Sequence, residues 1–131
     1  MKVVLDTNVL LSALAARGLC DAVLQGCLAA HELVLSDMIL QEVLKHLPSK
    51  FKLPPAHAEE IVAFLRSQAT IVTPVPVSPD ACRDSSDLEV LGTAVAGQAE
   101  CLVSGDEDLL VLKRYRGIEI LSPRAFHDWL C

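Results

Sequence analysis

The sequence lacks the features that would place it in several large classes of protein. Across its 131 residues no uncharged stretch approaches the roughly 20 residues that a membrane-spanning helix needs. The apolar run at the N-terminus carries a Lys, is interrupted by Asp6 and Asn8, and is not followed by a cleavage-like site, unlike a secretory signal. We therefore expect a cytoplasmic protein with no membrane segment.

Cysteine and glycine do not form the usual functional motifs. The five cysteines show no Cys-x-x-Cys spacing and do not cluster with the four histidines, so neither a zinc site nor a disulfide framework is expected. Most are expected to be small core residues, with Cys131 exposed at the terminus. No glycine-rich loop follows an apolar run, which removes the defining part of a P-loop or Rossmann motif.

Positive charge is also scarce. Eleven Lys and Arg residues stand against 17 Asp and Glu residues, for a formal net charge of −6. This is the wrong sign for a domain that holds nucleic acid by its overall field. Either the substrate is not a polyanion, or a bound group reverses the sign locally.

Short apolar runs alternate with helical patterns along the chain. Strands are predicted at residues 2 to 5, 33 to 36, 69 to 72, 101 to 104 and 118 to 121. Helices are predicted at residues 9 to 15, 19 to 30, 37 to 47, 56 to 68, 87 to 99, 106 to 115 and 122 to 130. Pro48 is expected to end the third helix, and residues 73 to 86 to form an extended loop. This alternation predicts one α/β domain over residues 1 to 131, with a parallel sheet between helices.

Acidic residues recur where the predicted strands end, at the edge where parallel sheets bind ligands. The acids at or near this edge are Asp6, Glu42, Asp87, Asp106 and Asp108. Four of them have an ordinary alternative as helix caps or solvated helix residues. Asp6 does not, because it follows a run that is expected to be buried on both faces, where a carboxylate needs a specific partner.

Converging carboxylates without basic partners would repel one another and resist ionising together. A hard divalent cation removes this problem, because Mg²⁺ prefers oxygen ligands and commonly uses carboxylates together with substrate phosphate oxygens. One or two such ions would neutralise the acids and attract a phosphodiester. The matching chemistry is metal-assisted hydrolysis.

Three segments together resemble a known family. In order, "VVLDTNVLLSAL", "SDMILQEV" and "CRDSSDLEVLGTAVAGQAECLVSGDEDLL" resemble the PIN domain, in particular its toxin-like nuclease branch related to VapC toxins. The resemblance covers nearly the whole chain. It implies a three-layer α/β/α sandwich with a central, mainly parallel sheet of four to five strands. It also implies an endoribonuclease that uses one or two Mg²⁺ or Mn²⁺ ions and acts as the toxin of a toxin-antitoxin pair.

The resemblance assigns roles by position. The implied catalytic acids are Asp6, Glu42, Asp87 and Asp106. The implied metal ligands are Asp6, Asp87 and Asp106, with Asn8, Ser104 and Asp108 in support. Asn8 is expected to orient Asp6 or a bound water, and Ser104 to hydrogen-bond a carboxylate or the water shell of the metal.

The segment before the third acid departs from the family pattern. It reads "DSSDLE" without the proline found in many relatives, so Asp84 and Asp87 both remain candidates for the third acid. Asp87 is preferred because it is predicted to begin a helix and stands 19 residues before Asp106, which leaves room for one helix and one strand. Asp84 is the expected loop or capping residue.

The resemblance also implies partners, namely an RNA substrate, an antitoxin protein and a second copy of the chain in a homodimer. The segments "LLSALAARGL" and "AFHDWL" are possible contact surfaces, with burial in the core as the default. The basic segment "KRYR" (113 to 116), Arg83 and residues 50 to 52 are expected to be solvated surface. If they flank the acidic site, they would contact RNA phosphates, and Tyr115 would stack on a base.

Two other functions fit parts of the sequence. The first is a PIN-type binding module that has lost catalysis, and the acids at all four positions argue against it. The second is a phosphotransfer protein in which Asp6 is phosphorylated, but a phosphatase of that kind needs a second Asp where this chain has Asn8. No histidine is expected to be catalytic, because none follows a predicted strand.

Overall fold

The helices and strands of the protein follow one another in βα alternation. The computed structural model describes residues 1 to 130, and the predicted exposure of Cys131 lies outside them. The strands are β1 (Lys2–Leu5), β2 (Glu32–Ser36), β3 (Thr70–Val72), β4 (Cys101–Val103), β5 (Arg114–Tyr115) and β6 (Ile118–Leu121). The helices are α1 (Thr7–Ala15), α2 (Leu19–Ala30), α3 (Asp37–Phe51), α4 (Pro55–Gln68), α5 (Ser85–Ala96), α6 (Glu107–Leu110) and α7 (Pro123–Leu130).

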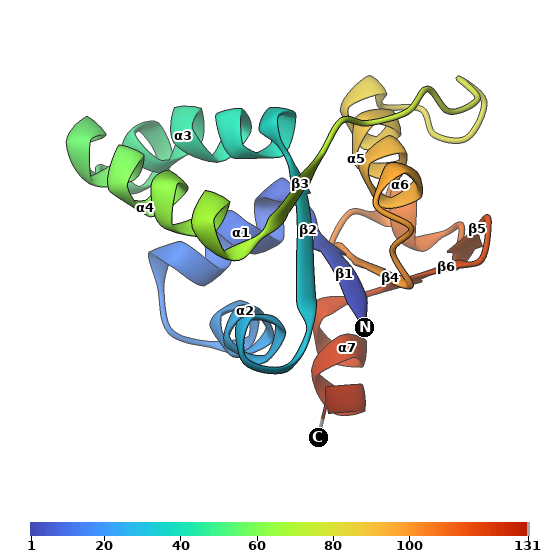
Figure 1. Ribbon diagram of the computed structural model, residues 1–131, viewed down its shortest axis with the longest axis horizontal. Helices are drawn as coiled ribbons and strands as arrows, with labels where there is room; N and C mark the ends of the chain where they lie inside the picture. The colour runs from blue at the N-terminus through green and yellow to red at the C-terminus, as the bar shows by residue number, and fades with distance from the viewer. Residues whose placement is uncertain (131) are drawn as a thin grey trace.

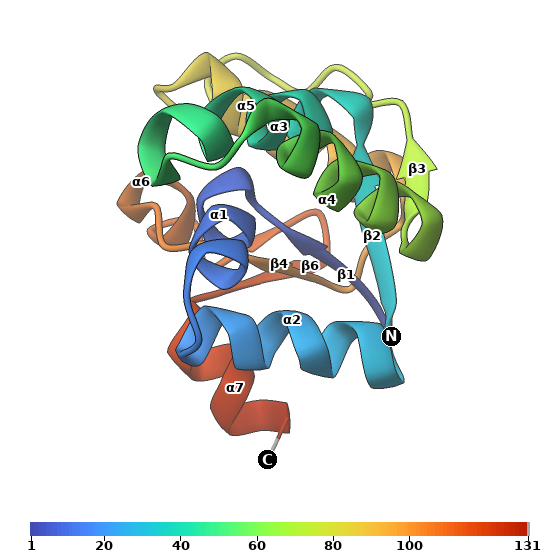
Figure 2. The same ribbon diagram turned by 90° about the vertical axis from the view of Figure 1, so that its left-hand side faces the viewer.

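The strands form one mixed sheet in the order β3-β2-β1-β4-β6-β5. All neighbouring pairs are parallel except β5 and β6, which pair antiparallel at the edge. Helices α1 to α4 cover one face and α5 and α6 the other, while α7 packs against α2 (Figures 1 and 2). The predicted α/β sandwich with a mainly parallel central sheet is confirmed, with six strands in the described chain instead of four to five.

The central strand β1 explains why a charged residue behind it is unusual. Val3, Val4 and Leu5 are fully buried, because helices cover both faces of the sheet at this position. The strand sequence is therefore a continuous apolar run, without the alternation of a half-exposed strand. The next residue, Asp6, lies where this buried run meets the first turn of α1.

Several predicted helix bounds differ from the structure, and three of these differences have a clear structural reason. Helix α3 does not end at Pro48 but continues to Phe51, where Lys52 takes the left-handed conformation (φ 55°). Pro48 lies in the last turn and removes one backbone hydrogen bond there, while the fully buried Leu47 before it holds the turn against the core. Helix α5 begins at Ser85, two residues before the predicted start at Asp87.

The third correction concerns the helix predicted at residues 106 to 115. Helix α6 ends at Leu110, because Lys113 turns the chain with a left-handed φ of 61°. The chain then forms the hairpin of β5 and β6, in which Arg116 (φ 49°) and Gly117 (φ 81°) make the turn. This hairpin supplies the sixth strand of the sheet.

Among residues 1 to 130 no single helix is long and apolar enough to cross a membrane. Helices α1 and α2 reach the required length and composition only as a pair, and the chain bends by 104° between them. Their apolar faces contribute Leu10, Leu11, Val23 and Leu24 to the core.

Candidate metal centre

The site begins at the carboxyl ends of β1 and β4, the two strands between which the strand order reverses. Leu5 pairs with Val103, so Asp6 and Ser104 follow the two strands at equivalent positions. The backbone N–H of Asp6 donates to the Val103 carbonyl over 3.1 Å. The Ser104 hydroxyl donates a hydrogen bond to the Asp6 carboxylate, which is one of the two contacts predicted for it.

Asp6 is a buried carboxylate whose two oxygens both have partners. Its side chain caps α1, with Oδ1 accepting from the Val9 N–H over 2.9 Å, while Oδ2 accepts from Ser104. The residue is 5% exposed. Burial raises the pKa of Asp6 above its ordinary value, against the opposite effect of these hydrogen bonds. The fold therefore holds Asp6 in one position at the end of the strand.

Asp84 and Asp87 divide the two roles left open by the sequence. Asp84 caps α5, because its Oδ1 accepts from the Ser86 N–H over 3.0 Å and from the Ser86 hydroxyl over 2.8 Å. Asp87 lies in the first turn of the helix and is 6% exposed. In the described chain its Oδ2 is buried and accepts no hydrogen bond. Asp84 is thus the capping residue, as predicted, and Asp87 points inward.

The environment of Asp87 disfavours its charged form. Burial raises the pKa of Asp87 to about 7, with further increases from the neighbouring Asp106 carboxyl and from Asp84 and Asp108. Carboxylates this close cannot all ionise without a compensating positive charge. A cation bound beside Asp87 would remove this cost and supply the missing partner for its Oδ2.

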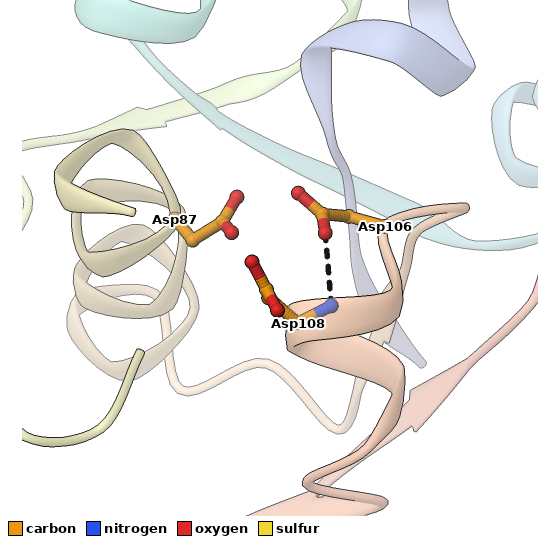
Figure 3. A group of neighbouring side chains, drawn as sticks. All are labelled: Asp87, Asp106 and Asp108. Carbon is orange, nitrogen blue, oxygen red and sulfur yellow. Dashed lines mark hydrogen bonds between the residues drawn. The ribbon is translucent and has the colours of Figure 1, made fainter. Parts of the chain in front are cut away.

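Asp106 and Asp108 face Asp87 from the turn after β4. The Asp106 side chain caps α6 by accepting from the Asp108 N–H over 2.9 Å, and its own N–H donates to the Ser104 hydroxyl over 2.9 Å. One carboxylate oxygen from each of Asp87, Asp106 and Asp108 lies within 4.8 Å of the other two (Figure 3). This set of oxygen donors matches Mg²⁺ or Mn²⁺. The aspartate triad can therefore hold a metal ion.

Asp6 is not a member of this triad, but it lines the same cleft. The cleft has a volume of about 210 Å³. This volume is several times the roughly 30 Å³ that one water molecule occupies in the liquid, so a hydrated ion fits in the cleft. Its lining includes the four predicted catalytic acids, Asp6, Glu42, Asp87 and Asp106. Asp108, predicted only as a supporting residue, belongs to the triad.

Asn8 lies at the exposed side of the cleft. Within residues 1 to 130 no side-chain hydrogen bond joins Asn8 to Asp6. The backbone N–H of Asn8, and not its side chain, lowers the pKa of the Asp6 carboxyl. The predicted role of its amide in orienting Asp6 or a water stays a prediction. The "KRYR" segment lies on the β5–β6 hairpin, and the Arg116 guanidinium covers the Tyr115 ring at 5.2 Å.

His46 is a cleft residue that the sequence did not reveal. It lies one turn after Glu42 on α3, and its Nε2 is 3.1 Å from Glu42 Oε2. Among the residues that line the cleft in the described chain, it is the one that can carry positive charge. The spacing of four residues on a helix was the available signal. His46 was not predicted as a site residue because it does not directly follow a predicted strand.

The fold and the site together define a class of protein. It is a mainly parallel α/β domain with an acidic, metal-compatible cleft where the strand order reverses. The family described as PIN domain matches residues 2 to 108, a range that contains every predicted site residue. The chain belongs to the PIN domain family. No curated protein sequence matches it.

Two solved structures contain chains with this fold. VapBC2 from Rickettsia felis, bound to a DNA fragment from its promoter, is similar over 93% of this chain and 98% of that one, with 16% identity and a TM-score of 0.61. VapBC-1 from nontypeable Haemophilus influenzae is similar over 95% and 99%, with 16% identity and a TM-score of 0.62. At this identity the likeness shows the shared fold.

Proposed function

We propose that the protein is an endoribonuclease that hydrolyses RNA phosphodiester bonds with one or two Mg²⁺ or Mn²⁺ ions. The observation that carries this proposal is the convergence of Asp6, Glu42, Asp87 and Asp106 on one cleft, with a buried oxygen of Asp87 that has no hydrogen-bond partner among residues 1 to 130. Proteins of the PIN domain family are typically nucleases, which supports the same function. A bound cation would also allow a protein of net charge −6 to bind a polyanion, because it would make the charge positive where the phosphate binds.

Each side chain has a part in the proposed reaction. Asp87 and Asp106 would hold the ion together with Asp6 or Asp108, and a bound ion would stabilise negative charge on the phosphate oxygens. The hydrogen bonds from Val9 and Ser104 keep Asp6 in place without reorganisation during the reaction.

Glu42 lies on α3 at the same cleft and is partly exposed. Its carboxylate accepts a proton from the attacking water in the proposed reaction. The neighbouring His46 holds that carboxylate in its orientation. Glu42 therefore serves proton transfer and His46 positions it, while the aspartates would hold the ion.

We further propose that the enzyme is the toxin of a toxin-antitoxin pair. The likeness in fold to chains of two VapBC structures supports this proposal. The expected partners are an antitoxin protein that covers the cleft and a second copy of the chain. In the two segments considered as contact surfaces, Leu10, Leu11, Ala13 and Phe126 are buried in the core, while the large apolar side chain of Trp129 is 56% exposed.

The proposed activity is tested with a labelled RNA and the purified protein. Cleavage is expected with Mg²⁺ or Mn²⁺ and is expected to stop with EDTA. Asp6→Asn and Asp106→Asn should each lower the rate by about 100-fold or more, because both remove a charge that acts on the ion or the transition state. Asp128→Asn is the matched control, since Asp128 is exposed and lies outside the cleft.

Other outcomes separate the alternative functions. If the wild type binds no divalent ion and Asp6→Asn cleaves as well as the wild type, the nuclease proposal is wrong. Ion binding without cleavage of any RNA would indicate a binding module. Covalent labelling of Asp6 by acyl phosphate would indicate a phosphotransfer protein.

A further inference from the structure

A second hollow lies directly beside the acidic cleft. It is a groove lined by Asp80, Cys82, Arg83, Asp108, Val111 and Leu112, among others. Adjacent residues connect the two hollows, because Arg83 lines the groove and Asp84 lines the cleft. Asp108 belongs both to the groove and to the aspartate triad. A chain-like substrate with a phosphate at the triad therefore extends naturally into the groove.

We infer that this groove binds one nucleotide of the RNA strand next to the bond that is cleaved, with Arg83 on its phosphate and Val111 against its base. The inference rests on the proposed function, and it adds a residue for substrate positioning outside the acidic cleft. The groove offers a positively charged side chain, Arg83, and an apolar surface at Val111. These two features match the phosphate and the base of a nucleotide.

Arg83 is suited to exchange one anion for another. Its side chain is 88% exposed, and Nη2 lies 2.7 Å from Asp108 Oδ1. Exposed ion pairs contribute little free energy, so the guanidinium can leave Asp108 at low cost. Its planar fork binds a phosphate through two parallel hydrogen bonds. A cation drawn to the triad would compete for Asp108 and free Arg83 at the moment when the substrate phosphate arrives.

The location of Arg83 distinguishes it from other arginines of the chain. Arg66 pairs with Asp37, Arg114 pairs with Glu119, and Arg116 covers the Tyr115 ring, and none of these three lines the cleft or the groove. In a protein of net charge −6, a polyanion needs a local positive group beside the ion. Arg83 supplies that group.

The apolar half of the groove is formed by the turn after α6. Val111 is 71% exposed, and Leu112 beside it is partly buried. An apolar side chain this exposed contributes little to the core. In the groove it offers a surface against which the face of a base can pack without hydrogen-bond selection, so this contact is expected to tolerate all four bases.

The test measures binding of a short labelled single-stranded RNA by fluorescence anisotropy at several salt concentrations. It uses the Glu42→Gln background, which lacks the proposed proton acceptor and therefore prevents cleavage. Arg83→Gln should weaken binding about fivefold. It should also lower the slope of log affinity against log salt by about 0.7, the value for one phosphate contact on a single strand. Val111→Ser should weaken binding about threefold and leave the slope unchanged, because it removes an uncharged contact.

Arg124→Gln is the matched control. It removes the same charge from an exposed position at the start of α7, which packs against α2 on the other side of the sheet. It should change affinity by less than about twofold and leave the slope as it was. Thermal unfolding checks that all three variants are folded. Because the three positions are exposed, no loss of thermal stability is expected.

The outcomes separate this inference from the proposed function. If Arg83→Gln and Arg124→Gln bind RNA alike with the same salt slope, the groove does not hold a phosphate and the inference is wrong, while cleavage by the wild type still supports the function. If the wild type neither cleaves nor binds RNA, the proposed function is wrong and the inference falls with it.

Discussion

Asp6 and Asp87 are two aspartates of one cleft that are equally buried but differently supported. They are 5% and 6% exposed. Both oxygens of Asp6 accept hydrogen bonds, from Val9 and Ser104, whereas Oδ2 of Asp87 accepts none in the described chain. The fold thus satisfies one carboxylate and leaves the other for a ligand. Substitution of Asp6 should harm the structure and the site together, while substitution of Asp87 should harm the site alone.

The largest effect expected from this contrast is on ion binding. Asp87→Asn should weaken the binding of Mn²⁺ by about 100-fold, because it removes the charge that lacks a protein partner. Isothermal titration calorimetry measures the affinity, with Asp128→Asn as the exposed control. Equal affinities for the two variants would show that Asp87 is not a ligand.

The next effect is a dependence of stability on pH in the metal-free protein. The pKa of Asp87 rises from 3.8 to about 7 on folding, so the folded state retains a proton that the unfolded chain releases between these values. The contribution of Asp87 to stability is therefore fully present below pH 4 and is lost as the pH rises through 7. For an isolated group, this difference in pKa corresponds to about 4 kcal/mol of unfolding free energy. Solvent in the cleft and the coupling to Asp106 reduce the expected loss of stability to roughly 2 kcal/mol.

Urea unfolding at several pH values measures this dependence. In Asp87→Asn the loss between pH 4 and 7 should shrink to the part due to Asp6, whose pKa burial also raises. Saturating Mn²⁺ should reverse the loss in the wild type at pH 7.5, because it stabilises the charged form. An unchanged pH profile in Asp87→Asn would contradict the assignment of the raised pKa to Asp87.

A smaller effect on stability is expected from the hydrogen bonds that hold Asp6. Ser104→Ala removes the donor to Asp6 and the acceptor of the Asp106 N–H, and should lower the free energy of unfolding by about 1.5 kcal/mol. Ser67→Ala is the control, since Ser67 is exposed and bonds only within its own helix. If both variants lose the same stability, the Ser104 contacts do not hold the site together.

The smallest effect separates Asp84 from Asp87. Asp84→Ala removes the cap of α5 and should lower the free energy of unfolding by less than Ser104→Ala does. It should change Mn²⁺ affinity by less than about threefold, because its carboxylate is bonded to Ser86 and is not part of the triad. A loss of affinity as large as that of Asp87→Asn would show that the two acids share the ion.

The sequence located the acidic edge because the signals for it are local. A buried strand that runs into Asp6 and a short strand that runs into Ser104 and Asp106 are both visible in a few residues. The alternation of strands and helices then places their ends at one edge. The adjacency of β1 and β4 is not local, since it depends on packing between segments about 100 residues apart.

The wrong predictions arose where one local pattern suits two structures. "RDSSDL" offers two aspartates that can each cap a helix, and the structure uses Asp84 because its carboxylate reaches Ser86. The segment after Asp108 has helical periodicity, but the left-handed Lys113 converts it into a hairpin. His46 was missed for another reason: its four-residue spacing from Glu42 indicated that the two side chains meet, but its contact with the cleft depends on the packing of α3 against α1.

The central claim is that the cleft holds a divalent ion at the carboxylate that the fold leaves without a partner. Anomalous diffraction from crystals of the wild type grown with Mn²⁺ tests it most directly, because the metal can be located by its own scattering. The account predicts a peak between the carboxylates of Asp87 and Asp106. A cleft without a peak at saturating Mn²⁺, or a peak bound away from Asp87, would contradict it.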